Sequence, residues 1–325
     1  ALGKAWHEIT TIYSEEKEYS KYFKRYDEML EATNKANAPW HVVSGEDLQA
    51  AQLEVYQTVV QELRRALYAF KEEKAKDKPS TGKSETAEKY DLLSKVDLSK
   101  SLKKAEYKEK LEKYQERLRI LQTEAANAGL SAVIAFEGWD AAGKGGAIRR
   151  LTAAMDPLAY AVNPVSAPNE VEKAFHYMWR FWIHVPLKGE MAIFDRTWYG
   201  RVMVERVEHF TPDVDWQRAY AEINETEAQW FENKIAIAKF WLQIDKDEQE
   251  RRFKLREEKP SKVWKITDED WRNRAKWPEY EVAVNEMLAK TSTSYAPWTI
   301  VEGNDKLYAR IKILKTVVEM LEKRL

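Results

Sequence analysis

The feature that most restricts the fold of this chain is a glycine-rich segment, Gly138–Gly146 (GWDAAGKGG), which follows the apolar run Ala132–Phe136 (AVIAF) after one residue, Glu137. A helical pattern follows over Ala147–Met155. A strand, a G-x-x-x-x-G-K loop and a helix in this order are typical of a phosphate-binding loop (P-loop). Backbone N–H groups, the helix N-terminus and the loop lysine surround phosphate oxygens there. The residues expected to bind phosphate are Gly138, Ala141, Ala142, Gly143, Lys144, Gly145 and Gly146.

The residue after the loop lysine departs from this motif. It is Gly145, where a serine or threonine hydroxyl normally binds magnesium. A metal at this loop must then depend on carboxylates, and Asp140 lies inside the loop itself. A carboxylate beside phosphate is repelled unless it holds a metal ion or accepts a proton. We expect one of these two roles for Asp140; the alternative is that it only caps a turn.

A second strand pattern ends in an acidic and basic cluster. The apolar run Met191–Phe194 (MAIF) leads into Asp195, which is the Walker B pattern. Because the carboxyl ends of parallel strands meet at one edge of a sheet, we expect Asp195 beside the P-loop, sharing a metal ion with Asp140. The residues that follow place two guanidinium groups at the same edge, and we expect Arg196 and Arg201 to bind phosphate.

A third cluster is basic and follows the strand pattern Ala236–Ile244. In P-loop kinases a lid that carries arginines closes over the transferring phosphoryl group at this position. A solvated helix face is the alternative interpretation. The lid is expected over about 246–275, and its candidate phosphate-binding residues are Arg252, Arg256, Lys259 and Lys262. Arg149, in the helix after the P-loop, would extend the positive path.

Strand and helix patterns alternate over the second half of the chain. Further strands are expected at Ala161–Val165 and Thr299–Val301, and a helix over about 101–127 that ends at a Gly129 cap. Asp305 is a plausible N-cap for the last helix. Continuous apolar strands separated by helices indicate an α/β fold, a parallel sheet with helices on both faces.

The chain also contains an internal repeat. Tyr22–Leu67 aligns with Tyr280–Leu325 at a constant offset of 258 residues without a gap, and the triplet APW recurs in register. Nothing before Lys71 contains a P-loop or a Walker B strand, so residues 1–70 are expected to be a truncated, mostly helical and non-catalytic copy. The charged stretch from Lys71 predicts a linker over 71–95, and the catalytic domain is expected over 96–325.

Composition narrows the function classes. The 53 Lys and Arg residues nearly balance 54 Asp and Glu, so no bulk basic field would attract nucleic acid, and an anion site must come from local clusters. The absence of cysteine excludes disulfides and thiolate metal sites and favours the cytoplasm. No apolar run approaches the roughly 18–20 residues that span a bilayer, so we expect no membrane association.

Several long motifs, in order along the chain, resemble the second family of polyphosphate kinases. They are VDLSKSL (Val96–Leu102), FEGWDAAGKGGAIRRL (Phe136–Leu151), HYMWRFW (His176–Trp182), IFDRTWYGRVMVERVE (Ile193–Glu208), REEKPSKVWKITDEDW (Arg256–Trp271) and APWTIVEGNDK (Ala296–Lys306). The resemblance implies a thymidylate-kinase-like, three-layer α/β/α fold with a helical lid. It also implies reversible phosphoryl transfer between inorganic polyphosphate and nucleotides, Mg²⁺ and a basic channel.

The resemblance also implies roles for single residues. Asp140 and Asp195 match the family's essential aspartates, and Lys144 matches its P-loop lysine. Arg196 and Arg201 match phosphate-binding arginines, and Arg252, Arg256 and Lys259 match lid positions. A tryptophan at position 139 resembles the branch of the family that phosphorylates nucleoside monophosphates. Some members of that branch contain two kinase-like halves in tandem.

These observations together predict a polyphosphate:AMP phosphotransferase that forms ADP. We expect a homo-oligomer. Two alternatives remain open at this point: an ATP-dependent nucleoside monophosphate kinase, and a module that binds nucleotide or polyphosphate without turnover.

Overall fold

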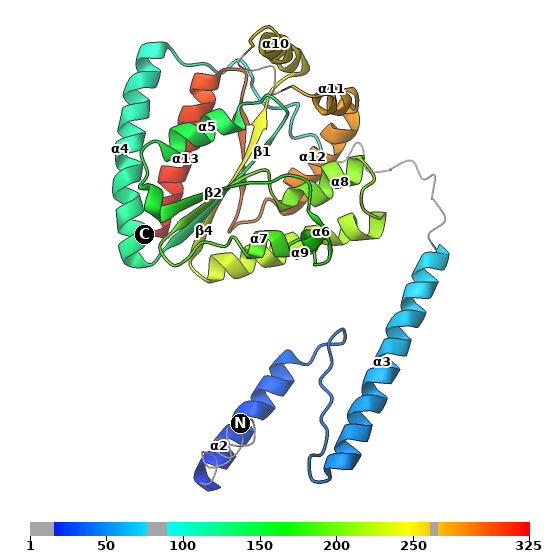
Figure 1. The fold of residues 1–325 in the computed structure, drawn as a ribbon. Coiled ribbons are helices and arrows are strands. Elements are labelled where there is room, and N and C mark those ends of the chain that lie inside the picture. The colour runs from blue at the N-terminus through cyan, green and yellow to red at the C-terminus, as the bar shows by residue number, and fades with distance from the viewer. Residues whose placement is uncertain (1–15, 77–89, 261–265) are drawn as a thin grey trace. The chain divides into compact units, whose positions relative to one another are not determined.

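A computed structural model describes residues 16–76, 90–260 and 266–325 (Figure 1). The chain divides into two compact units, Ala1–Lys83 and Ser84–Leu325, and the division falls inside the stretch expected to be a linker. Each unit is described by itself. In the described part of the chain, no helix has the length and apolar character needed to cross a membrane.

Among the described residues of the first unit there are two helices, α2 (Glu16–Thr33) and α3 (Leu48–Lys76). Helix α3 continues past Lys71, into the range predicted to be linker, and residues 77–89 lie outside the described residues. The connection between the helices is held by local hydrogen bonds: Trp40 Nε1 donates to Thr33 Oγ1 at 2.7 Å, and Asp47 Oδ1 accepts from two N–H groups that open α3.

The second unit is built on a parallel sheet whose strand order is β2-β3-β1-β4-β5. The strands are β1 (Ser131–Gly138), β2 (Tyr160–Pro164), β3 (Met191–Asp195), β4 (Ile235–Gln243) and β5 (Trp298–Glu302). Every strand expected from the sequence is present. Strand β1 lies at the centre, and its Phe136 is in register with Asp195 of β3 and Phe240 of β4.

Helices cover both faces of this sheet, which confirms the three-layer α/β/α fold. In Figure 1, α4 (Lys104–Ala128), α5 (Lys144–Thr152) and α13 (Lys306–Arg324) lie together on one side. Two predicted caps are confirmed. Gly129 ends α4 with a φ of 65°, and the Asp305 side chain accepts from Tyr308 N at the start of α13.

The other face carries α9 (Asp213–Glu232), which packs on β4, and α12 (Trp277–Thr291), which packs on α9. Shorter elements lie in the connections between the strands and the long helices. They are the 3-10 turns η1 (Pro157–Ala159) and η2 (Trp198–Val202), and helices α6 (Glu170–Lys173), α7 (Trp179–Trp182), α8 (Val204–Val207), α10 (Lys246–Glu257) and α11 (Asp268–Ala275).

The core explains why the central strands are apolar along their whole length. Both faces of β1 and β4 lie under helices, so side chains such as Ile134, Phe136 and Phe240 have no exposed surface. The carboxyl ends of β1, β3 and β4 meet at one edge of the sheet. The P-loop, the segment after Asp195 and the start of α10 are therefore brought together at that edge.

Candidate active site

The P-loop has the backbone conformation that its glycines allow. Gly138 has a φ of 150°, and a Cβ there would lie 2.7 Å from Leu242 O, so only glycine fits between the loop and β4. Gly143, with a φ of 115°, precedes α5, which begins at Lys144. Lys144 Nζ donates to Gly138 O at 2.6 Å, so the lysine lies along the inside of the loop. The loop amides, the helix N-terminus and this ammonium form a site for phosphate oxygens.

Asp140 makes a polar contact with each of its two carboxylate oxygens. Its Oδ1 lies 3.6 Å from Arg196 Nη2, and its Oδ2 accepts from Asn273 Nδ2 at 3.2 Å. Arg196 has a left-handed backbone with a φ of 67°, and its N–H donates to Phe136 O at the end of β1. The structure thus brings Asp140 and Arg196 together, as expected, and adds Asn273 of α11, which sequence reasoning missed.

Asp195, at the end of β3, lies next to the P-loop. A Cβ placed on Gly145 would lie 4.0 Å from Asp195 Oδ2, so this carboxylate stands next to the position where the motif usually has a hydroxyl. Asp140, within the loop, and Asp195, at the end of β3, therefore both offer carboxylate oxygens at the P-loop. Among the described residues, no group of three or more His, Cys, Asp and Glu side chains is arranged to hold a metal ion.

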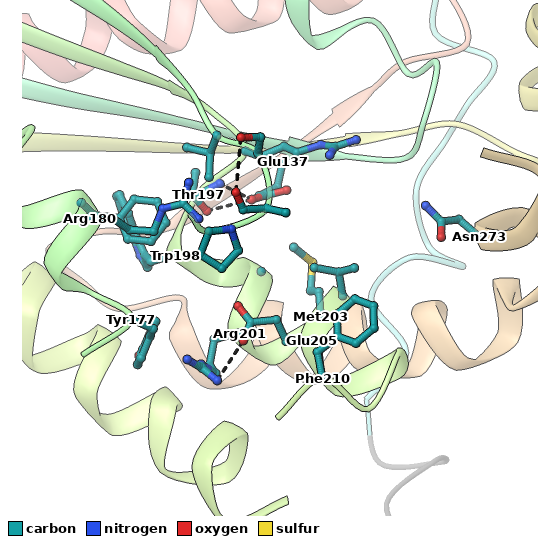
Figure 2. A pocket seen from close by; sticks show the side chains of 18 of the residues that line it. Glu137, Tyr177, Arg180, Thr197, Trp198, Arg201, Met203, Glu205, Phe210 and Asn273 are labelled. Atoms are coloured by element: carbon teal, nitrogen blue, oxygen red, sulfur yellow. Dashed lines mark hydrogen bonds and ion pairs between the residues drawn. The ribbon is translucent and has the colours of Figure 1, made fainter. Parts of the chain in front are cut away.

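Glu137 is a site residue without an assigned role in the sequence analysis. It is the residue before the P-loop, is 5% exposed, and its Oε1 accepts from Thr197 N at 2.7 Å and Thr197 Oγ1 at 2.8 Å (Figure 2). Burial raises the pKa of its carboxyl, while Lys144 and Arg196 act in the opposite direction. Glu137 joins the end of β1 to the segment after β3. The sequence signal that could have identified Glu137 is an acidic residue at the end of an apolar strand.

The P-loop opens into a cavity of about 640 Å³ that extends to Arg201. Arg201 Nη1 lies 2.8 Å from Glu205 Oε2, and its guanidinium stacks over the Tyr177 ring at 4.5 Å (Figure 2). Burial raises the pKa of the Glu205 carboxyl against the nearby charge of Arg201. Arg180 also lines the cavity, 3.4 Å from Glu172. Four cations thus line one cavity: Lys144, Arg180, Arg196 and Arg201.

The predicted lid residues have different environments. Arg252 is 2% exposed and donates to the P-loop carbonyls of Ala141 and Ala142 and to those of Gly303 and Asn304. In this conformation it holds the outside of the loop to the start of α13. Burial lowers the pKa of Arg256, against the opposing charges of Asp270 and Asp140.

The other two lid residues and Arg149 have fewer described contacts. Lys259 is exposed just after α10, and Lys262 lies outside the described residues. Arg149 is exposed in the last turn of α5. Phosphate binding by the lid residues and by Arg149 stays a prediction.

Trp139 lines the cavity, but most of its surface is packed against other side chains. It is 7% exposed and stacks on Trp277 of α12 with ring centroids 3.7 Å apart. Its Nε1 donates to Gln243 Oε1, which also accepts from Trp241 Nε1. The residue that marked a monophosphate-specific branch in the sequence therefore ties the P-loop to β4 and to the helix after the lid.

Comparison with known proteins agrees with this geometry. The family model described as polyphosphate kinase 2 (PPK2) matches residues 3–71 and 101–325. A polyphosphate:AMP phosphotransferase of Pseudomonas syringae pv. tomato is 44% identical over 98% of this chain and 64% of its own length. A polyphosphate:AMP phosphotransferase of Pseudomonas aeruginosa is 46% identical over 94% of this chain and 61% of its own length.

A solved structure gives the same result. The crystal structure of a protein described as a polyphosphate kinase 2 from Pseudomonas aeruginosa matches with a TM-score of 0.82 at 45% identity. It covers 94% of this chain, and the match takes in 62% of that structure. The chain thus spans about three fifths of the length of these relatives. Because the family model matches most of the chain and these relatives are 44–46% identical over nearly all of it, the chain belongs to the polyphosphate kinase 2 family.

Proposed function

We propose that this chain transfers a phosphoryl group from inorganic polyphosphate to AMP, forming ADP, in a reversible reaction. The observation that carries the proposal is one cavity that is lined by the P-loop, Asp140 and four cations, which suits two anionic substrates that meet near Asp140. The relatives named polyphosphate:AMP phosphotransferase support the choice of donor and acceptor.

The chemistry we propose is direct in-line transfer. An oxygen of the AMP phosphate attacks the terminal phosphorus of polyphosphate, and the bond from that phosphorus to the bridging oxygen breaks. The shortened polyphosphate leaves with the electron pair. Lys144 and the loop amides hold one of the phosphates, and Arg196 meets the charge that develops at the transferring group. Positioning and electrostatic stabilisation supply most of the rate, because little proton transfer is needed.

Asp140 has a specific part in this scheme. Its carboxylate contacts both Arg196, which follows β3, and Asn273 of α11, and all three residues line the cavity. We propose that it orients the attacking phosphate and accepts its proton when that phosphate is protonated. We also propose that Arg256, Arg252, Lys259 and Lys262 of the lid, with Arg149 and Arg201, contact the polyphosphate chain or the nucleotide phosphate.

Magnesium fits the donors at this site. Mg²⁺ is usually held by one or two carboxylates, with waters and substrate phosphates completing its shell. Asp140, within the loop, and Asp195, at the end of β3, supply two carboxylates in place of the hydroxyl that Gly145 lacks. When bound there, the ion would draw negative charge from the phosphate oxygens. Oligomer formation, the absence of nucleic-acid binding and the cytoplasmic location stay predictions.

The decisive experiment is an assay of purified chain with AMP, long-chain polyphosphate and magnesium in the absence of ATP. We expect ADP to form, and chromatography of the nucleotides measures it. A parallel reaction replaces polyphosphate with ATP. Product in the ATP reaction alone would identify an ATP-dependent monophosphate kinase, and binding of both substrates without product would identify a non-catalytic module.

A further inference from the structure

A buried ion pair lies beneath η2, on the face of β4 that also carries Trp241, a residue of the cavity lining. Lys239 of β4 and Glu227 of α9 have side chains with no exposed surface, and Lys239 Nζ lies 2.7 Å from Glu227 Oε2. The same ammonium donates to Tyr199 Oη at 2.8 Å and to Thr291 O at 2.7 Å. All three ammonium hydrogens therefore have acceptors.

The second oxygen of Glu227 is equally occupied. Its Oε1 accepts from Tyr199 Oη at 2.6 Å and from Trp198 Nε1 at 3.1 Å. The two residues that open η2 are thus both bound to one buried carboxylate. Two charges removed from water are usually no more stabilising than a well-packed apolar pair of the same size. The hydrogen bonds from Trp198 and Tyr199 give the pair a second effect, which is to fix the orientation of η2.

The position of η2 matters because it carries or adjoins two of the arginines that line the cavity. Arg196 precedes it and Arg201 lies within it. On the P-loop side, Glu137 binds both the N–H and the hydroxyl of Thr197. The left-handed backbone of Arg196, which a non-glycine residue adopts only when its surroundings hold it, stands directly before this anchored stretch.

We propose that the Glu227–Lys239 pair is a positioning device of the active site, which holds η2 so that Arg196 and Arg201 face the substrate phosphates. The pair touches no substrate, since neither residue lines the cavity. It acts through Trp198 and Tyr199. The proposal rests on the phosphate-binding part of the function proposed above.

The sharpest test removes a single oxygen. Tyr199→Phe deletes the hydroxyl that joins η2 to both members of the pair but leaves the ion pair in place. Tyr295→Phe is the matched control, because Tyr295 Oη also donates a partly buried hydrogen bond, to Asn224 O at 2.8 Å. Tyr295 does not line the cavity. Glu227→Gln is a second variant that removes the charge while keeping an oxygen acceptor.

Two readouts separate positioning from stability. Calorimetry gives the Tm of each variant, and titration with inorganic tripolyphosphate gives a Kd that does not require turnover. For Tyr199→Phe we expect the Kd to rise and kcat to fall, each by about tenfold, since small displacements of positioning groups have large effects on rate. Tyr295→Phe should lose a similar amount of Tm with Kd and kcat at the wild-type values. Glu227→Gln should follow Tyr199→Phe with a larger effect, up to about a hundredfold in kcat.

Equal Tm losses for the two Tyr→Phe variants with unchanged Kd and kcat in both would overturn the proposal, because the pair would then be structural only. Wild-type chain that binds tripolyphosphate but forms no ADP would instead contradict the proposed function. The Kd comparison between the variants would still decide the positioning role in that case.

Discussion

The two copies of the internal repeat have the same local structure and opposite exposure. In the first copy Trp40 Nε1 donates to Thr33 Oγ1 at 2.7 Å, and in the second Trp298 Nε1 donates to Thr291 Oγ1 at 2.8 Å. Both threonine hydroxyls donate to the carbonyl four residues earlier. The aspartates that open the last helix of each copy, Asp47 and Asp305, accept the same backbone bond.

The apolar side chains of the two copies differ in burial. Met29, Val59 and Leu63 of the first copy are 42%, 49% and 65% exposed. Their equivalents Met287, Val317 and Leu321 have no exposed surface. Helix α13 packs on α4, α5 and β4, whereas the described residues of the first unit form no strand beyond one isolated bridge. The repeat sequence therefore encodes the helices and their connection, and a sheet elsewhere in the chain provides the burial.

The largest expected effect tests whether catalysis belongs to the second unit alone. Asp140→Asn should lower kcat by about 10³-fold, because the P-loop loses a carboxylate that orients phosphate and suits magnesium. Polyphosphate should still bind. Asp27→Asn, an exposed position in the first copy, is the control and should leave kcat unchanged. Steady-state ADP formation measures both, and undiminished turnover in Asp140→Asn would remove this residue from the mechanism.

The next effect concerns stability at equivalent leucines. Leu321→Ala should lower the free energy of unfolding by about 2–5 kcal/mol, since it leaves a cavity between α13 and the core. Leu63→Ala, at the matching exposed position, should change it by about 0.5 kcal/mol or less. Urea denaturation measures both. A loss at Leu63 as large as that at Leu321 would mean that the first copy is covered by a partner.

A smaller effect is expected at the threonines that the copies share. Thr291→Val leaves the indole N–H of Trp298 without its acceptor in a partly buried place, which should cost about 1–2 kcal/mol. Thr33→Val disturbs the same bond in an exposed place, where water can replace it, and should cost about 0.5 kcal/mol or less. Thermal unfolding followed by calorimetry compares the pair; equal losses would show that burial does not set the value of this bond.

The smallest expected effect concerns a buried charged group, Glu137, and the pH dependence of stability. Burial raises the pKa of Glu137, so above the ordinary pKa of 4.5 the folded state binds a proton that the unfolded state has lost, and stability falls as pH rises. Glu137→Gln keeps an acceptor for Thr197 and removes this dependence. The Tm of this variant should therefore equal that of the wild type at pH 4 and lie slightly above it at pH 8. A difference in Tm that does not change with pH would contradict the assignment.

Much of the fold was accessible from the sequence because its signals are local. Apolar runs such as Ala132–Phe136 fixed the strands, and the spacing of Gly138, Gly143 and Lys144 fixed the P-loop. The proximity of Asp140 and Arg196 followed from the rule that parallel strands end at one edge. Asp305 and Gly129 were recognisable caps because their partners lie within one helical turn.

The missed residues depend on contacts between distant segments. Lys239 lies in a strand that reads as apolar, and only the packing of α9 on β4 reveals its partner Glu227. A run of basic residues cannot show which arginine turns inward, and Arg252 binds backbone carbonyls because the P-loop and the start of α13 approach it. Such pairings carry no sequence periodicity.

The hydrogen bonds shared by the two copies also bear on the order of folding. The Thr–Trp bond, the Asp caps and the helix ends form in the first copy without any sheet, so their formation is a local event. The region from Tyr280 to Leu325 can adopt its connection before it finds β4 and α4, which reduces the number of slow, long-range closures needed to complete the fold. We therefore expect the final strand and helix of the second unit to dock as a preformed segment.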